Sequence, residues 1–502
     1  MPMNIDNVPH RKRASMLQAI GGYVNTGLTV IQGLVLIPLY LHYIGAHTYG
    51  LWLASGGILT WLGFVDMGIS GMFVQRIARA YGQRDLSQVG AYFTNGMIIS
   101  FCMSLMFVGL GLGVSLWLPE LLHAAEQANL LQQCFQLAIL ATGLNIANEC
   151  LRAFAQALLR PVFAILSLIA CRVLGLAATI VFLFDDFGLW SIPLGSAITA
   201  GSVFMLNSAN AARLFSSLGT KASISMEVLR EYIHISPALF AGRIGNAMVK
   251  QIEPLLITIV FHPELATAYT VTKRAADIIS QLLQVIIASS FPSFAHLAGE
   301  AGAAKITQVM RYIVTLIFML GLIGFGSYIA MNRSFVSLWV GAEYFLDSKV
   351  VILIAAGALV MVLRNTISRM LVGLGDIAIP SLLMLLEAIV RVVLMAILLK
   401  AIGIAGVPAA MLVSCGVFLA VYTTRVEKRL PSAVGHGSLV KAALITTLAF
   451  IIALLIAHSL PSPGGWWLFA VYAFAVLAVF FTGTFFLSPS LRSIAVKSLI
   501  RH

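Results

Sequence analysis

Long apolar segments separated by short polar loops follow one another along the chain from residue 17 to residue 487. Each segment is long enough to cross a hydrocarbon core of about 30 Å, which takes roughly 20 helical residues. The segments lack the alternation of apolar and polar residues that strands of a membrane barrel show. Helices are predicted over 17–40, 48–75, 90–118, 131–158, 161–184, 189–212, 231–260, 266–297, 306–330, 348–372, 378–400, 404–424, 438–459 and 464–487. We expect an all-α polytopic membrane protein with about 14 transmembrane helices, and a count of 12 stays open.

The composition agrees with a chain whose solvent is lipid. Hydrophobic residues make up 60% of the 502 positions, charged residues make up 10%, and the mean hydropathy is +0.96. A soluble domain carries about 25% charged residues. The sequence contains no HExxH, GxSxG or P-loop motif, so neither metal, serine-hydrolase nor nucleotide chemistry is predicted. We expect a protein that is not an enzyme and has no cofactor and no metal.

The basic residues indicate how the helices are oriented. The net charge is +12, and 22 of the 31 Lys and Arg residues lie at the termini or in even-numbered loops and the adjoining helix turns. Only Arg333, Lys349 and Lys400 lie in odd-numbered loops. Because Lys and Arg concentrate on the cytoplasmic side, we expect a multi-pass protein of the bacterial inner membrane with both termini in the cytoplasm. Cations scattered between apolar runs predict no nucleic-acid partner.

An internal repeat relates the two halves of the chain. Residues 187–193 (FGLWSIP) resemble residues 402–408 (IGIAGVP) at an offset of 215, with one glycine and one proline in register. Such an offset across six helices predicts two parallel six-helix lobes, with a substrate site between them. The predicted parts are an N-terminal lobe at 1–225, a C-terminal lobe at 226–430, and two additional helices with a cytoplasmic tail at 431–502.

Six cations lie well inside predicted spans, where a charge is costly. An Arg or Lys that faces lipid at the helix centre costs about 2.5–3.5 kcal/mol even on the lenient insertion scale. The six are Arg172, Arg243, Lys250, Lys273, Arg274 and Arg391. Arginine forks bind phosphate oxygens in bidentate fashion. We therefore expect these residues to line a cationic cavity that binds a pyrophosphate.

Carboxylates allow a second interpretation of the same cations. Glu253, Asp277 and Glu387 stand three or four residues from four of them, at a spacing that permits ion pairs along one helix. Three carboxylates oppose six cations, so about three positive charges are left over. Asp66 and Glu149 lie towards cytoplasmic helix ends, where either could carry a coupling proton or Na⁺, or could cap or pair locally. These five carboxylates are the candidates for coupling or gating.

Residues 37–82 resemble the start of the Wzx-type polysaccharide flippases. The shared features include a proline at the end of the first helix, residues 49–52 (YGLW) and Asp66. Segment 269–299 is similar to that family's eighth helix, and segment 335–344 (FVSLWVGAEY) is similar to its outer loop before helix 10. The family belongs to the multidrug/oligosaccharidyl-lipid/polysaccharide exporter superfamily, and the resemblance covers essentially the whole chain.

The resemblance implies a function and its partners. It implies a flippase that moves an undecaprenyl-pyrophosphate-linked oligosaccharide from the cytoplasmic to the periplasmic leaflet by alternating access, for export of a surface polysaccharide. Membrane lipid, H⁺ or Na⁺, and a polysaccharide polymerase or export machinery are the implied partners. In the related peptidoglycan-precursor flippases two extra C-terminal helices form a groove for the lipid tail, and the helices in 431–502 look similar.

Two other functions compete with this interpretation. A drug or cation antiporter of the same superfamily should have a cavity dominated by carboxylates and aromatic residues, whereas cations predominate here. A membrane-embedded polysaccharide polymerase or ligase would need a large outer catalytic loop, and the longest outer loop predicted is 331–347. A lipid-linked oligosaccharide flippase is therefore the favoured function.

Overall fold

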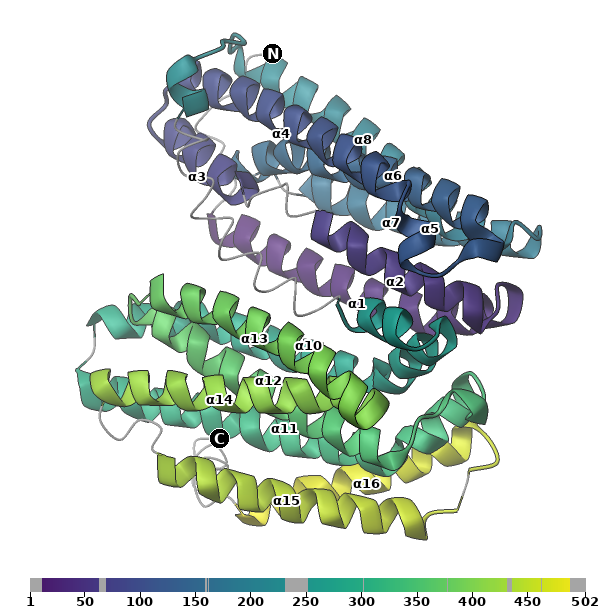
Figure 1. The fold of residues 1–502 in the computed structure, drawn as a ribbon. Helices are drawn as coiled ribbons and strands as arrows, with labels where there is room; N and C mark the ends of the chain where they lie inside the picture. Colours follow the sequence, from purple (N-terminus) through teal and green to yellow (C-terminus); the bar gives the residue numbers. More distant parts are fainter. Residues whose placement is uncertain are drawn as a thin grey trace. The chain divides into compact units, whose positions relative to one another are not determined.

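The structure, a computed structural model, describes residues 11–62, 69–158, 160, 162–230, 252–300, 302–376, 378–430, 436–461 and 463–487. All regular elements in this part of the chain are helices (Figure 1). Contacts between residues divide the chain into two compact units, Met1–Ala266 and Thr267–His502. The fold is the all-α membrane fold that the apolar pattern predicts.

The first unit is organised around helix α6. Its main helices are α1 (Arg11–Tyr43), α2 (Ala46–Leu62), α3 (Ile69–Gly82), α4 (Leu86–Ser115), α6 (Ala128–Ala157), α7 (Val162–Phe184) and α8 (Ser191–Leu218), and the short α5 (Leu118–Leu121) follows α4. Helix α6 packs against α4 and α8, and α7 packs against α1 and α8. Phe154 of α6 is fully buried, and its ring stacks on that of Phe93 of α4 with 4.1 Å between centroids.

Small residues allow α7 and α8 to approach closely. A Cβ atom on Gly175 would lie 1.8 Å from Thr199 Oγ1, and one on Gly195 would lie 1.9 Å from Thr179 Oγ1. Each threonine hydroxyl donates to the glycine carbonyl one turn earlier on its own helix, over 2.9 Å. Small-residue contacts of this kind bring membrane helices together by van der Waals packing.

The second unit repeats this arrangement around α12. Its helices are α10 (Pro263–Glu300), α11 (Ala303–Trp339), α12 (Ser348–Gly373), α13 (Ala378–Ile402), α14 (Gly406–Arg429), α15 (His436–Ser459) and α16 (Trp466–Leu487). Helix α12 packs against α11 and α14, and α13 packs against α14. Both α15 and α16 pack against α11, so the two C-terminal helices add to the six-helix pattern without altering it.

The predicted spans coincide with helices wherever the structure describes them. Nine helical stretches of the described part are long and apolar enough to cross a membrane, and one of them, Ile379–Arg429, contains both α13 and α14. The predicted span 48–75 falls on α2 and α3, and only residues 252–260 of the predicted span 231–260 are described as helix. The membrane class and the helical pattern are thus confirmed.

The internal repeat has a conformational counterpart. Gly188 and Gly403 both adopt positive φ angles, +53° and +69°, which glycine reaches without steric cost. Each glycine opens a short 3₁₀ turn, and the helix that follows carries a proline at its third residue, Pro193 in α8 and Pro408 in α14. The same turn therefore enters the last helix of each six-helix set.

The limits of the lobes stay a prediction. The first compact unit extends to Ala266, beyond the predicted limit at 225, because Leu255 and Ile259 pack with a buried cluster that includes Leu51 of α2. Residues 231–251, which join the two regions, lie outside the described residues.

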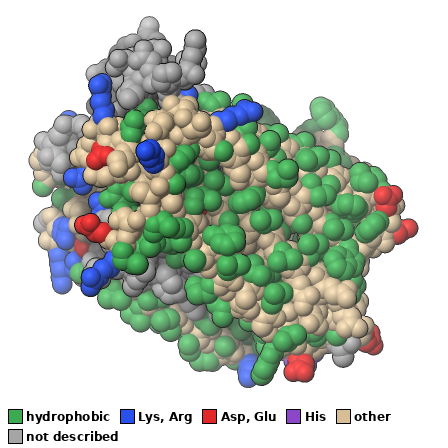
Figure 2. Space-filling view, turned by 90° about the horizontal axis from the view of Figure 1, so that it is seen from above, with side chains coloured by type: hydrophobic (Ala, Val, Ile, Leu, Met, Phe, Trp, Pro, Cys, Tyr) green, Lys and Arg blue, Asp and Glu red, His purple; other side chains and the backbone are tan. Residues whose placement is uncertain are grey.

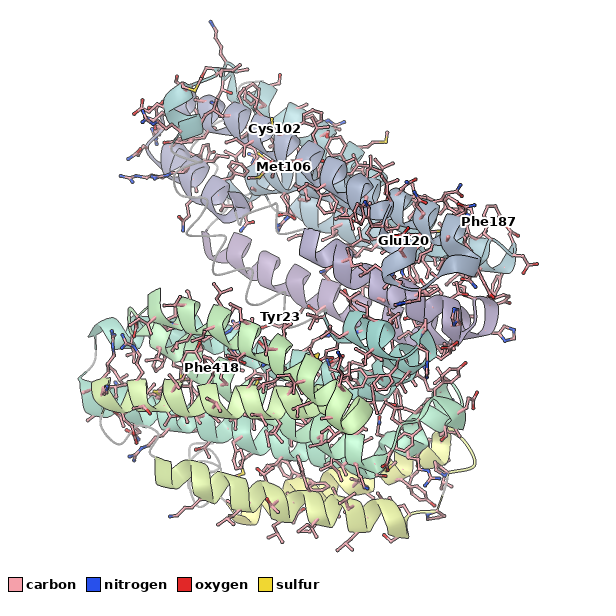
Figure 3. The ribbon with its side chains drawn as sticks, viewed as in Figure 1. Tyr23, Cys102, Met106, Glu120, Phe187 and Phe418 are labelled. Carbon is pink, nitrogen blue, oxygen red and sulfur yellow. The ribbon has the colours of Figure 1, made fainter. Side chains whose placement is uncertain are left out.

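The connections at one end of the first unit carry basic residues, and those at the other end carry none. The connections from α4 to α6 and from α7 to α8 contain no Lys or Arg and carry Glu120, Glu126, Asp185 and Asp186. Figure 3 labels Glu120 and Phe187 at this end. The connections at the other helix ends carry Arg84, Arg160 and Lys221. On the face drawn in Figure 2, Lys and Arg side chains gather towards one end, beside a broad apolar surface.

This charge distribution predicts which end faces the cytoplasm. In a variant without native cysteines, Asp186→Cys should react with a membrane-impermeant maleimide in intact cells, whereas Arg84→Cys should react only after permeabilisation. The reverse labelling pattern would overturn the predicted orientation.

Candidate functional site

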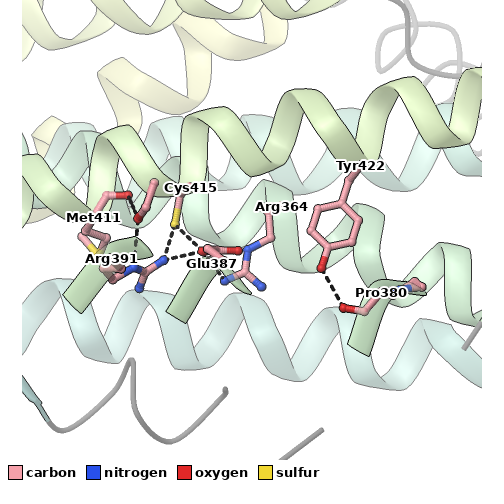
Figure 4. Close-up of polar contacts among 8 residues, drawn as sticks. Arg364, Pro380, Glu387, Arg391, Met411, Cys415 and Tyr422 are labelled. Carbon is pink, nitrogen blue, oxygen red and sulfur yellow. Dashed lines mark hydrogen bonds and ion pairs between the residues drawn. The ribbon is translucent and has the colours of Figure 1, made fainter. Parts of the chain in front are cut away.

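A cluster of charged residues lies inside the helix bundle of the second unit (Figure 4). The carboxylate of Glu387 on α13 accepts hydrogen bonds at Oε1 from Nη2 of Arg364 on α12, over 2.9 Å, and from Nη2 of Arg391, over 2.6 Å. Arg391 Nε donates to Ser414 Oγ of α14 over 3.0 Å, and the Cys415 thiol contacts both Arg391 and Glu387. We call these five residues the charged cluster.

The charged cluster is shielded from its surroundings. Glu387 and Arg391 have relative exposures of 0%, and Arg364 has 4%. The ion pair between Glu387 and Arg391 that the spacing of four residues allows is therefore present. Arg391 was predicted to line a cavity, but its guanidinium lies where a passenger cannot contact it in this structure.

Arg364 is a member of the site that the sequence analysis missed. Arg364 is one of the 22 Lys and Arg residues assigned above to the termini, the even-numbered loops and the adjoining helix turns, although eight residues of the predicted span 348–372 follow it. At 1.5 Å per residue, eight residues place it about 12 Å inside the helix end. Depth within the span was the signal that could have identified it.

A second buried polar cluster, made of neutral residues, lies in the first unit. Asn207 Nδ2 of α8 donates to Asn148 Oδ1 of α6 over 2.9 Å, and Ser167 Oγ of α7 donates to Asn207 Oδ1 over 3.1 Å. All three side chains are buried. This amide cluster joins α6, α7 and α8, as the charged cluster joins α12, α13 and α14, and it carries no charge. Isolated Asn and Ser residues in apolar runs gave no signal in the sequence.

Arg172 is the predicted cation of the first unit that the structure describes. Its Nη1 donates to Thr29 Oγ1 of α1 over 2.7 Å, and Thr29 in turn donates to the carbonyl of Asn25. The side chain is half-buried. Among the described residues no carboxylate pairs with Arg172, so a neutral hydroxyl orients it and its charge stays available.

Lys273 and Arg274 lie on α10. Lys273 Nζ is 3.5 Å from Asp277 Oδ1 and 6.0 Å from the ring centroid of Tyr269, close enough for a weak cation–π interaction. The lysine side chain is 16% exposed, and Asp277 is 38% exposed. Arg274 is half-buried, and its Nε has no hydrogen-bond partner in the described part of the chain. The local pairing of Lys273 with Asp277 is confirmed, and Arg274 keeps an unfilled donor.

Side chains of α11 hold α10 at this level. Tyr328 Oη and Asn332 Nδ2 both donate to the carbonyl of Thr272, each over 3.0 Å, and Thr272 Oγ1 donates to the carbonyl of Tyr344 over 3.2 Å. Because Thr272 directly precedes Lys273 and Arg274, these bonds fix the backbone from which both cations project.

The remaining candidates are distributed as follows. Glu149 forms an ion pair with Arg152, three residues along α6, as the local interpretation predicts. Glu253 is buried, at 3% exposure. Arg243, Lys250 and Asp66 lie outside the described residues. Among the described candidates, the structure brings together Glu387 and Arg391, and Lys273 and Asp277.

Comparison with known proteins identifies the group to which this chain belongs. The sequence model of a family described as "Polysaccharide biosynthesis protein" matches residues 58–348, more than half of the chain. The chain belongs to this polysaccharide biosynthesis protein family. No curated protein sequence matches it.

Solved structures with the same fold are transporters. The lipid II flippase MurJ, in an inward closed conformation, is 13% identical with a TM-score of 0.69, covering 92% of this chain and 98% of its own. An inward-facing multidrug resistance MATE family transporter of the MOP superfamily is 14% identical with a TM-score of 0.66, covering 80% and 95%. A MOP superfamily transporter from Pyrococcus furiosus is 14% identical with a TM-score of 0.55, covering 84% and 96%. The chain thus has the MATE/MurJ-like fold.

The charged cluster predicts an asymmetric response to substitution. Glu387→Ala leaves two buried guanidinium groups without a carboxylate and should cost about 3–5 kcal/mol of stability. Arg391→Met should cost less, because it leaves the Glu387–Arg364 pair intact. Thermal unfolding of the purified protein in detergent measures both, and an equal loss in the two variants would contradict this account of the cluster.

Proposed function

We propose that this polysaccharide biosynthesis protein is a flippase that moves an undecaprenyl-pyrophosphate-linked oligosaccharide from the cytoplasmic to the periplasmic leaflet of a bacterial inner membrane. The observation that carries the proposal is the family match over residues 58–348. A polysaccharide pathway in a multi-span transporter fold needs a polar glycan to cross the membrane, and the lipid carrier keeps that glycan at the bilayer. Transport proceeds by alternating access, with the sugars in a hydrated cavity.

The length of the structural match agrees with a lipid-linked passenger. The lipid II flippase MurJ matches 92% of this chain, whereas the MATE transporter matches 80%. The larger share is what two further C-terminal helices would give, and α15 and α16 pack as such a pair on α11. In the proposal these helices guide the prenyl tail.

The available cations suit a pyrophosphate. Arg172 is oriented by a hydroxyl and not by a carboxylate, and Arg274 has an unfilled donor at Nε. Together with Lys273, Arg243 and Lys250 they form the proposed pyrophosphate set, because guanidinium groups bind phosphate oxygens in bidentate fashion. Arg391 is left out of this set because the charged cluster encloses it. Asp66, Glu253 and Asp277 remain candidates for coupling to H⁺ or Na⁺.

A drug or cation antiporter is the second candidate, since the MATE transporter shares the fold. A cation as passenger would be repelled by Arg172, Lys273 and Arg274, whereas a pyrophosphate would be attracted. Host sensitivity to cationic drugs should therefore not change when the gene is deleted, while surface polysaccharide should be lost.

The proposed set can be tested in cells. Arg172→Ala, Lys273→Ala and Arg274→Ala should each lower surface polysaccharide at least about tenfold, a loss of roughly 1.4 kcal/mol of binding, and should cause the lipid-linked oligosaccharide to accumulate. Arg333→Ala and Lys400→Ala, which remove exposed cations of α11 and α13, are the matched controls and should export normally. Normal polysaccharide in all three variants, at normal protein levels, would refute the assignment.

A further inference from the structure

The charged cluster carries more positive than negative charge. Arg364 and Arg391 contribute two guanidinium groups, and Glu387 contributes the one carboxylate that pairs with them among the described residues. Guanidinium groups stay protonated in proteins. The remaining neighbours are a serine hydroxyl and a thiol, so the cluster has a net charge of +1 between three helices that span the membrane.

An uncompensated charge at this depth is unfavourable. Moving an ion from water to a low-dielectric interior costs several kcal/mol even after relaxation, and breaking the balance of a buried ion network is strongly destabilising. The apolar packing of α12, α13 and α14 keeps bulk water away, since Ala388 and Met395 of α13 and Val362 of α12 are 0% exposed. The net charge thus calls for a counter-ion and not for solvent screening.

The same residues have hydrogen-bonding groups left over. Arg364 Nε and Arg391 Nη1 are buried donors without a partner in the described part of the chain, and Glu387 Oε2 is a buried acceptor without one. Each belongs to a side chain that is at least nine-tenths buried. Two unfilled guanidinium N–H groups on the two cations are the groups that bind a small anion, because hydrogen bonds from a charged donor to an ionised acceptor are about twice as strong as neutral ones.

We propose that the charged cluster binds one small monovalent anion, of the chloride class, as a built-in counter-ion of the second unit. One such anion brings the net charge of the cluster from +1 to zero and occupies the unfilled donors of Arg364 and Arg391. The amide cluster of the first unit has no charge and needs no counter-ion. The site is separate from the passenger site, and its existence does not depend on which molecule the protein transports.

The small number of unfilled donors and the close neighbours of Arg391 explain why the ligand is small. A phosphate or a carboxylate carries several acceptor oxygens and would need more donors than these two N–H groups offer. Ser414 and Cys415 of α14 and Glu387 of α13 fill the other sides of Arg391. A single halide ion needs less space and fewer hydrogen-bond donors than a phosphate or a carboxylate.

The test is the thermal stability of the purified full-length protein in detergent, with chloride replaced by gluconate at constant ionic strength. The expected result is a saturable rise of Tm of at least about 2 °C in chloride and in bromide, since a ligand that binds the native state stabilises it by mass action. Equal Tm values in all three salts would overturn the proposal.

Three variants assign the effect to the cluster. Arg364→Met makes the cluster neutral, so its Tm should no longer depend on halide, whereas Glu387→Gln raises the net charge to +2 and should enlarge the dependence. Arg172→Met removes a cation of the first unit and should keep the wild-type response. A halide response that persists in Arg364→Met would place the anion elsewhere and refute the site.

The thiol of Cys415 offers the alternative source of negative charge. If Cys415 were a thiolate, it would neutralise the cluster, and the wild-type protein would show no halide response. Cys415→Ala should keep the response if an anion binds. A response that appears only in Cys415→Ala would show that the thiolate, and not an external anion, balances the two arginines.

Discussion

The cost of ionised side chains inside a membrane span is the constraint on which this structure depends. Each cation in a span must meet a carboxylate, a polar group or a passenger. The described part of the chain shows the first two of these arrangements. Arg391 is enclosed with Glu387 and Arg364, Arg172 rests on a threonine hydroxyl, and Lys273 divides its contacts between Asp277 and Tyr269. Which arrangement a cation adopts decides whether it stabilises the fold or stays available to a passenger.

Both units pack three helices around buried polar groups, but the charge of these groups differs between the units. Both enter their last helix through a glycine with positive φ, and both bring three helices together around buried polar groups. In the first unit these groups are neutral amides that satisfy one another. In the second they are ions that leave a net charge. The repeat therefore extends to the glycine–proline turns of the backbone, while the buried polar groups of the two units differ in charge.

The sequence predicted the helices and their repeat because long apolar runs and glycine–proline turns are strong local signals. It also predicted the Glu387–Arg391 pair, since a spacing of four residues places two side chains on one face. It did not predict that Arg391 points into the bundle. In α13 the apolar residues surround the helix, so no polar face indicates how the helix is rotated about its axis. Arg364 was missed because its partners come from another helix, and such contacts have no fixed spacing along the chain.

Reconstitution of the purified protein tests the central claim most directly. Liposomes would contain an undecaprenyl-pyrophosphate-linked oligosaccharide with a labelled sugar, and a glycosidase added outside would report the share exposed in the outer leaflet. The account predicts that liposomes with the protein expose nearly all of the labelled glycan, and protein-free liposomes only the outer-leaflet share. Equal exposure in both, together with transport of a lipophilic cationic dye by the protein, would contradict it.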